Sequence, residues 1–229
     1  MDRLASASTS CVFETNNNQQ QWQRRCRRQR LRNEQHSNEY DADADADAAT
    51  AADAENRGNQ TNMAILINCA GFLDPKYPSL SETALEDFEK TFRTNTRGAF
   101  ICCKEAAKRV VRGGGGRIIM MSTSQVGALS PGYGIYTASK AAVETMVRVL
   151  AKELKGSQIT ANCVAPGTIA TEMFYAGKSD ETVKMLASAS PMGRIGEPKD
   201  VAEIVGFLAG DGGEWINGQV IRTNGGLVV

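Results

Sequence analysis

Residues 117–155 constrain the fold of this chain more than any other segment, because they contain an apolar run, a loop and a long helical pattern in direct succession. The apolar run at 118–121 predicts a buried strand, and three hydroxyl residues follow it. After a loop at 127–134, apolar residues recur at helical spacing from Tyr136 to Leu154. A buried strand that leads through a loop into a helix is typical of α/β proteins with a parallel sheet.

Tyr136 and Lys140 are candidate acid/base residues on that helix. Their spacing of four places both side chains on one helical face, one turn apart. An ammonium beside a phenol favours the phenolate, so we expect Lys140 to lower the pKa of Tyr136. Tyr-x-x-x-Lys also occurs on ordinary solvated helices. The hydroxyl residues at 122–124 support a functional interpretation of this motif. They follow a predicted strand, and open α/β sheets bind their ligands at the carboxyl ends of strands.

The remainder of residues 63–229 continues the alternation of strands and helices. Further strands are predicted at residues 63–68, 158–165 and 219–223. Helical patterns run from a candidate N-cap at Ser81 to about residue 111, and over 181–189 and 199–210. Glycines 113–116 follow a helix and precede a strand, the reverse of a phosphate-binding loop, so we interpret them as a connection. The fold class is therefore α/β with a doubly wound parallel sheet.

Residues 1–62 do not resemble a folded unit. They include an amide-rich run at 16–23, a basic run at 24–32 and alternating Asp and Ala at 41–48. With few apolar residues, burial cannot offset the entropy lost on ordering, so we predict a disordered low-complexity tail before a domain at 63–229. The basic run also fits a nucleic-acid patch, which we consider the weaker interpretation. The Ala/Ser/Thr-rich opening weakly resembles an organelle transit peptide.

Composition excludes several classes of function. The formal net charge is zero, so neither nucleic acid nor an acidic membrane surface is an expected partner. No apolar run approaches the roughly 20 residues of a membrane span. The six cysteines show no paired spacing, which favours a reducing compartment: the cytoplasm or, with a transit peptide, an organelle stroma or matrix. The one histidine, His36, lies in the tail, so no metal site and no His-based triad is expected.

The motifs of residues 63–229 together resemble the short-chain dehydrogenase/reductase family, and most closely its plant aldehyde-reductase-like members. The carrying segments are Asn-Cys-Ala-Gly at 68–71, Asn-Thr-Arg-Gly at 95–98, Ser-Thr-Ser at 122–124, Tyr-Thr-Ala-Ser-Lys at 136–140 and Pro-Gly-Thr-Ile-Ala-Thr at 166–171. The resemblance implies hydride transfer between a nicotinamide cofactor, NADP(H) rather than NAD(H), and a small carbonyl/alcohol substrate. It also implies that the four strands are the C-terminal ones of a partial Rossmann-type sheet.

The resemblance implies roles for individual residues. Tyr136 would transfer the substrate proton, Lys140 would hold the tyrosine and the nicotinamide ribose, and Asn95 would hold a water in the proton relay. The catalytic hydroxyl is Thr123 by gapless counting, or Ser124 if the loop is shifted by one residue. Besides Tyr136 and Lys140, the implied cofactor-binding residues are Asn68, Ala70, Gly71, Pro166, Gly167, Ile169 and Thr171. Residues 173–191 would form a lid over the substrate.

Residues 1–62 show no counterpart of the family's first third, which includes the glycine-rich turn that binds the pyrophosphate. We therefore expect an N-terminally truncated family member with impaired cofactor binding and an apolar strand edge at 63–68. The expected partners are further copies of the chain or full-length family members. An alternative function is that of a catalytically inactive subunit that only binds and oligomerises.

Overall fold

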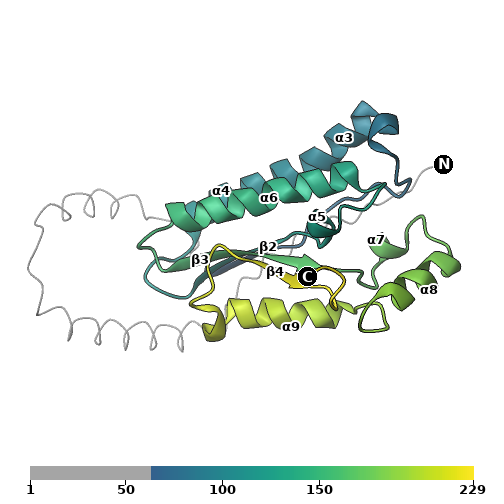
Figure 1. The fold of residues 1–229 in the computed structure, drawn as a ribbon. Helices are drawn as coiled ribbons and strands as arrows, with labels where there is room; N and C mark the ends of the chain where they lie inside the picture. The colour runs from purple at the N-terminus through teal and green to yellow at the C-terminus, as the bar shows by residue number, and fades with distance from the viewer. Residues whose placement is uncertain (1–62) are drawn as a thin grey trace, which may run out of the picture.

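The structure of this protein, a computed structural model, describes residues 63–229. Four parallel strands form its centre (Figure 1). The strands are β1 (Ile65–Asn68), β2 (Gly116–Met121), β3 (Ile159–Pro166) and β4 (Val220–Thr223). They lie in the order β1-β2-β3-β4, and every neighbouring pair is parallel. The predicted parallel sheet is therefore confirmed, and the carboxyl ends of its four strands meet at one edge.

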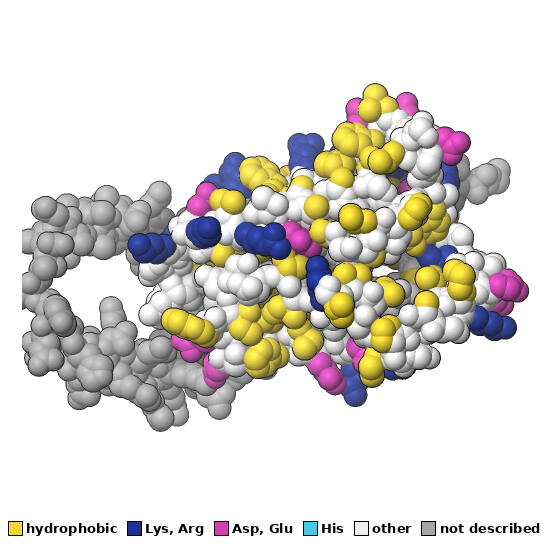
Figure 2. Space-filling model, in the orientation of Figure 1, with side chains coloured by type: hydrophobic (Ala, Val, Ile, Leu, Met, Phe, Trp, Pro, Cys, Tyr) yellow, Lys and Arg dark blue, Asp and Glu magenta, His cyan; other side chains and the backbone are white. Residues whose placement is uncertain are grey.

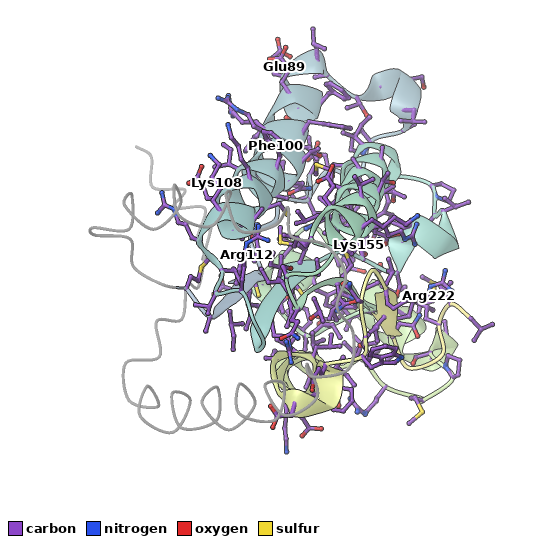
Figure 3. All side chains as sticks on the ribbon, turned by 90° about the vertical axis from the view of Figure 1, so that its left-hand side faces the viewer. Glu89, Phe100, Lys108, Arg112, Lys155 and Arg222 are labelled. Carbon is purple, nitrogen blue, oxygen red and sulfur yellow. The ribbon has the colours of Figure 1, made fainter. Side chains whose placement is uncertain are left out.

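Helices cover both faces of the sheet, as the end-on view in Figure 3 shows. One face carries α3 (Leu85–Phe92), the π-helical segment η3 (Arg93–Arg97), α4 (Gly98–Arg109) and α6 (Gly134–Glu153), and the other carries α9 (Pro198–Ala209). Shorter elements are η2 (Leu80–Glu82), α5 (Gln125–Ala128), α7 (Glu172–Tyr175), α8 (Asp180–Ala189) and η4 (Asp211–Gly213). This arrangement leaves the carboxyl edge of the sheet next to α5, α7 and α8 (Figure 1).

The central strand β2 shows why both faces must be covered. Successive side chains of a strand point to opposite faces. Ile118 therefore joins a core cluster with Val147 of α6, whereas Ile119 joins a second cluster with Leu208 of α9. Each of these side chains is at most 1% exposed, and burying one contributes roughly 1.5–3 kcal/mol. The continuous apolar run seen in the sequence is the pattern of a strand buried on both sides.

The helix predicted from Ser81 differs from the structure at its start. Ser81 belongs to the 3₁₀ turn η2, where its hydroxyl shares a hydrogen bond of 3.0 Å with that of Ser79. Helix α3 begins three residues beyond η2, and its N-cap position is held by Ala84 without a side-chain hydrogen bond. The prediction of a cap at Ser81 was wrong because the hydroxyl is used locally in a separate turn.

The predicted tail, with its basic run and His36, lies outside the described residues. Among residues 63–229, β1 pairs only with β2, and its side chains Ile65 and Ile67 are partly exposed. No helix in this part of the chain is both long and apolar enough to cross a bilayer. Within the same residues, no group of three or more His, Cys, Asp or Glu side chains could hold a metal ion.

Candidate active site

A cleft of about 780 Å³ lies at the carboxyl ends of β1, β2 and β3. Open α/β sheets bind their ligands at this edge, and the volume falls within the range usual for small-molecule sites. The α7–α8 segment, residues 172–189, borders the cleft on one side, and Figure 2 shows hydrophobic side chains gathered over this segment and over α3. The predicted site residues that line the cleft are Gly71, Thr123, Ser124, Tyr136, Lys140, Pro166, Gly167, Ile169 and Thr171.

The two candidate hydroxyls, Thr123 and Ser124, have different surroundings. Thr123 directly follows Ser122 at the end of β2. Its Oγ1 accepts a hydrogen bond from Gln125 N at 3.3 Å, and its side chain lies close enough to the phenol of Tyr136 to act on the pKa of that group. Ser124 Oγ instead donates to Ala165 O at 2.9 Å, and the Ser124 amide donates to Pro166 O at 2.8 Å. The structure therefore brings Thr123 together with the phenol, whereas the Ser124 hydroxyl faces the backbone of β3.

Lys140 is a buried cation at the base of the cleft, only 3% exposed. Its Nζ donates to Met121 O at 2.8 Å and more weakly to Ala70 O at 3.5 Å. Met121 is the last residue of β2, and Ala70 lies in the loop that follows β1. Lys140 therefore connects the end of β2 and this loop to α6. A Cβ added to Gly71 would come within 3.4 Å of Lys140 Nζ, so a larger residue there would crowd the ammonium.

The pKa values of Tyr136 and Lys140 correct the prediction that the lysine lowers the pKa of the tyrosine. Burial raises the pKa of Tyr136 to about 12, and the hydrogen bond with Thr123 acts in the opposite direction. Burial lowers the pKa of Lys140 to about 8. The prediction was wrong in this structure because loss of solvation disfavours the charged form of both groups. The protonated phenol is therefore the stable form at neutral pH.

Asn95 does not line the cleft and is 1% exposed. Its Oδ1 accepts a hydrogen bond from Phe72 N at 2.7 Å, and its Nδ2 donates to Phe72 O and Ser139 Oγ, each at 2.9 Å. In the next residue, Thr96 Oγ1 donates to Ser139 O at 3.0 Å. The π-helical turn η3 places these side chains side by side, and the amide of Asn95 joins the loop after β1 to α6.

Asn68 and Ala70 also lie behind the cleft wall. Asn68 Oδ1 accepts from Ala70 N at 2.9 Å, and Ala70 O is the weaker acceptor of Lys140 Nζ. The side chain of Asn68 is buried, with 6% exposure. These two residues therefore shape the loop that leads to Gly71, which does line the cleft.

The segment after β3 forms the opposite wall. The Gly167 amide donates to Thr223 O at 3.0 Å, and a Cβ on Gly167 would come within 2.8 Å of Asn224 Cα, so this close approach requires glycine. Ile169 pairs with Gly196 in a short parallel bridge. Thr171 caps α7 by accepting a hydrogen bond from Phe174 N at 3.3 Å. These contacts hold Gly167, Ile169 and Thr171 beside the sheet edge.

Three further residues that the sequence did not single out line the cleft: Gln125, Tyr133 and Lys178. Gln125 Oε1 is buried and has no hydrogen-bond partner among the described residues. Tyr133 precedes Tyr136 by nearly one helical turn, so its spacing was a usable signal. Lys178 belongs to the predicted lid, but only tertiary contacts bring it to the cleft, and no local pattern marks it.

Comparisons with known proteins agree with this geometry. A family described as "Enoyl-(Acyl carrier protein) reductase" matches residues 3–228. The NADPH-dependent aldehyde reductase-like protein, chloroplastic, of Arabidopsis thaliana is 62% identical over 176 residues, which are 77% of this chain and 65% of that protein. A short-chain type dehydrogenase/reductase of Picea abies is 58% identical over 164 residues, 72% of this chain and 60% of that protein. The chain thus spans less than two thirds of the length of these relatives.

Solved structures give the same result. The crystal structure of the angucycline C-6 ketoreductase LanV with bound NADP superposes with a TM-score of 0.65 at 29% identity, over 77% of this chain and 66% of that one. The fold, the cleft at the carboxyl edge and the sequence matches all point to one family. This chain belongs to the short-chain dehydrogenase/reductase family of oxidoreductases.

Proposed function

We propose that this chain is an NADP(H)-dependent reductase of a small carbonyl compound and, in the reverse direction, oxidises the corresponding alcohol. The observation that carries the proposal is the meeting of Tyr136, Thr123 and Lys140 in one cleft at the carboxyl edge of the sheet. A relative named as an NADPH-dependent aldehyde reductase-like protein and a structure of a ketoreductase with bound NADP support this substrate class and cofactor.

Tyr136 is the proposed proton donor. When bound, NADPH would supply the hydride for the carbonyl carbon, and Tyr136 would give its phenolic proton to the carbonyl oxygen, which becomes the alcohol oxygen. The pKa of about 12 keeps the phenol protonated at neutral pH, as reduction requires. Thr123 is the proposed second donor to the same oxygen, because its hydroxyl already meets the phenol. Ser124 is the weaker choice, since its hydroxyl is bound to Ala165 O.

The test is replacement of Tyr136 by phenylalanine, which removes only the phenolic oxygen. Loss of a general acid costs about 10²- to 10⁴-fold in turnover, so NADPH-dependent aldehyde reduction by Tyr136→Phe should fall by at least about 100-fold. Tyr175→Phe is the matched control, because Tyr175 is 49% exposed and does not line the cleft. Equal turnover by Tyr136→Phe and the wild type would refute the proposal.

The cleft fits the nicotinamide half of the cofactor. Lys140 and Tyr136 offer donors at its base, and Gln125 contributes a buried acceptor that lacks a partner among the described residues. No strand-to-helix turn in residues 63–229 carries the glycines that cradle a pyrophosphate, so we expect weak binding. Titration of NADPH fluorescence should give a Kd well above the micromolar range, and micromolar affinity would contradict this expectation.

A homo-oligomer is the proposed assembly. Phe100 and Ile101 of α4 are 50% and 48% exposed, and Val149 of α6 is 49% exposed. Figure 3 labels Phe100 on the helical layer. Light scattering should give a mass that is a multiple of 24.6 kDa, and a monomer would argue against this assembly. The alternative of an inactive, merely oligomerising subunit receives no support from the comparisons.

Compartment and domain boundary complete the proposal. Of the two expected locations, the word "chloroplastic" in the name of the Arabidopsis relative supports an organelle over the cytoplasm. Imaging of a fluorescent fusion in plant cells would decide between them.

The domain is proposed to begin at residue 63, so limited proteolysis should leave a fragment that starts close to this position.

A further inference from the structure

Lys178 stands out among the cleft residues that the proposed chemistry does not use. It lies in the turn between α7 and α8, and its Nζ donates to Phe174 O at 2.8 Å and to the hydroxyl of Tyr77. The ammonium also lies 4.3 Å from the ring centroid of Tyr77 and 4.9 Å from that of Phe174. Two hydrogen bonds and two aromatic rings thus hold its position.

The charge of Lys178 is not balanced by a neighbouring carboxylate. Among the described residues, no Asp or Glu oxygen lies within 4.0 Å of its Nζ, in contrast to Lys76 and Arg194, which pair with Asp87 and Asp200. Burial lowers the pKa of Lys178, so the ammonium is partly withdrawn from water. Of its three donors, the contacts above use two. A partly desolvated cation with a spare donor therefore lines the cleft.

A row of tyrosines connects Lys178 to the reacting end of the cleft. The Tyr77 and Tyr133 rings lie 5.1 Å apart, and Tyr133 precedes Tyr136 by nearly one helical turn of about 5.4 Å. Lys178 and Tyr136 therefore line the same cleft, and the Tyr77 and Tyr133 rings link the two positions. The other side chains that α7 and α8 contribute to the cleft, Met173, Phe174 and Leu186, carry no charge.

We propose that Lys178 determines substrate choice by pairing with a carboxylate that the substrate carries several bonds away from the reacting carbonyl. The substrate class is thus that of medium-length oxo acids, with the carbonyl at Tyr136 and the anion at Lys178. This inference rests on the proposed function, since it specifies the substrate of the same cleft. An ion pair in this partly dry position is stronger than one in water, and the apolar walls suit the intervening chain.

A pair of aldehydes of equal chain length tests the proposal: hexanal, and adipic semialdehyde, in which a carboxylate replaces the terminal methyl group of hexanal. The wild type should show a higher kcat/KM for the carboxylated aldehyde. The ratio of the two kcat/KM values should fall about 10- to 100-fold in Lys178→Met, which keeps the apolar stem, and should recover in part in Lys178→Arg. Lys184→Met, on the exposed face of α8, is the matched control and should leave the ratio unchanged.

The outcomes separate this inference from the proposed function. If Lys178→Met slows both aldehydes equally, Lys178 only fastens α7 and α8 to the Tyr77 loop, and the inference is overturned. If the wild type reduces neither aldehyde, the proposed function fails. Calorimetric binding of hexanoate and hexanol to the wild type and Lys178→Met then decides the matter. Loss of a preference for hexanoate on substitution supports the carboxylate site, and equal weak binding of both compounds refutes it.

Discussion

Replacing Lys140 by methionine should change how the stability of the protein depends on pH. Burial lowers the pKa of Lys140 from 10.5 to about 8 in the folded protein. Below pH 8 the lysine is charged in both states, and burial of the charge destabilises the folded one. Between pH 8 and 10.5 only the unfolded chain keeps the proton, so the free energy of unfolding rises with pH. At about 1.4 kcal/mol per pH unit, the total rise is about 3 kcal/mol.

Lys140→Met has no lysine to titrate at this position. Subtracting its curve of unfolding free energy against pH from that of the wild type therefore isolates the contribution of Lys140. Urea unfolding of both proteins should be measured from neutral pH to pH 10.5. The unfolding free energy of the wild type, minus that of the variant, should increase by about 3 kcal/mol over this range. Lys152 is an exposed lysine of the same helix, and the curve of Lys152→Met should run parallel to that of the wild type. Parallel curves for the wild type and Lys140→Met would refute the argument that burial shifts this group.

Two further predictions concern residues around the cleft. Thr123→Val should lower kcat by about 10²- to 10³-fold, as loss of an oxyanion donor does. Ser124→Ala should have a smaller effect on kcat and should lower the free energy of unfolding by about 1 kcal/mol. Steady-state kinetics that show the larger loss in Ser124→Ala would reverse this assignment. Asn95→Leu leaves the amide and carbonyl of Phe72 without their partner, so it should lower the unfolding free energy by about 2–4 kcal/mol. An unchanged urea midpoint would show that water replaces these bonds.

Local patterns in the sequence were sufficient for the strands, most helices and the Tyr136–Lys140 face, because these depend on periodicities of two and 3.6 residues along one segment. The start of α3 was missed because Ser81 forms a local turn with Ser79, which competes with capping. The hydrogen bonds of Asn95 to Phe72 could not be predicted, because Phe72 lies 23 residues away and is reached only through the folded loop after β1.

The fold class and the family could be read from the order and spacing of residues along the chain, and the same pattern suggested Tyr136 as the candidate proton donor. The choice between Thr123 and Ser124 as the neighbour of Tyr136 required the three-dimensional structure, because the Ser124 hydroxyl is bonded to the backbone of β3. The three-dimensional structure also decided the direction of the pKa shifts. Burial depends on what surrounds a group in three dimensions, and here it outweighs the attraction expected from two residues one turn apart.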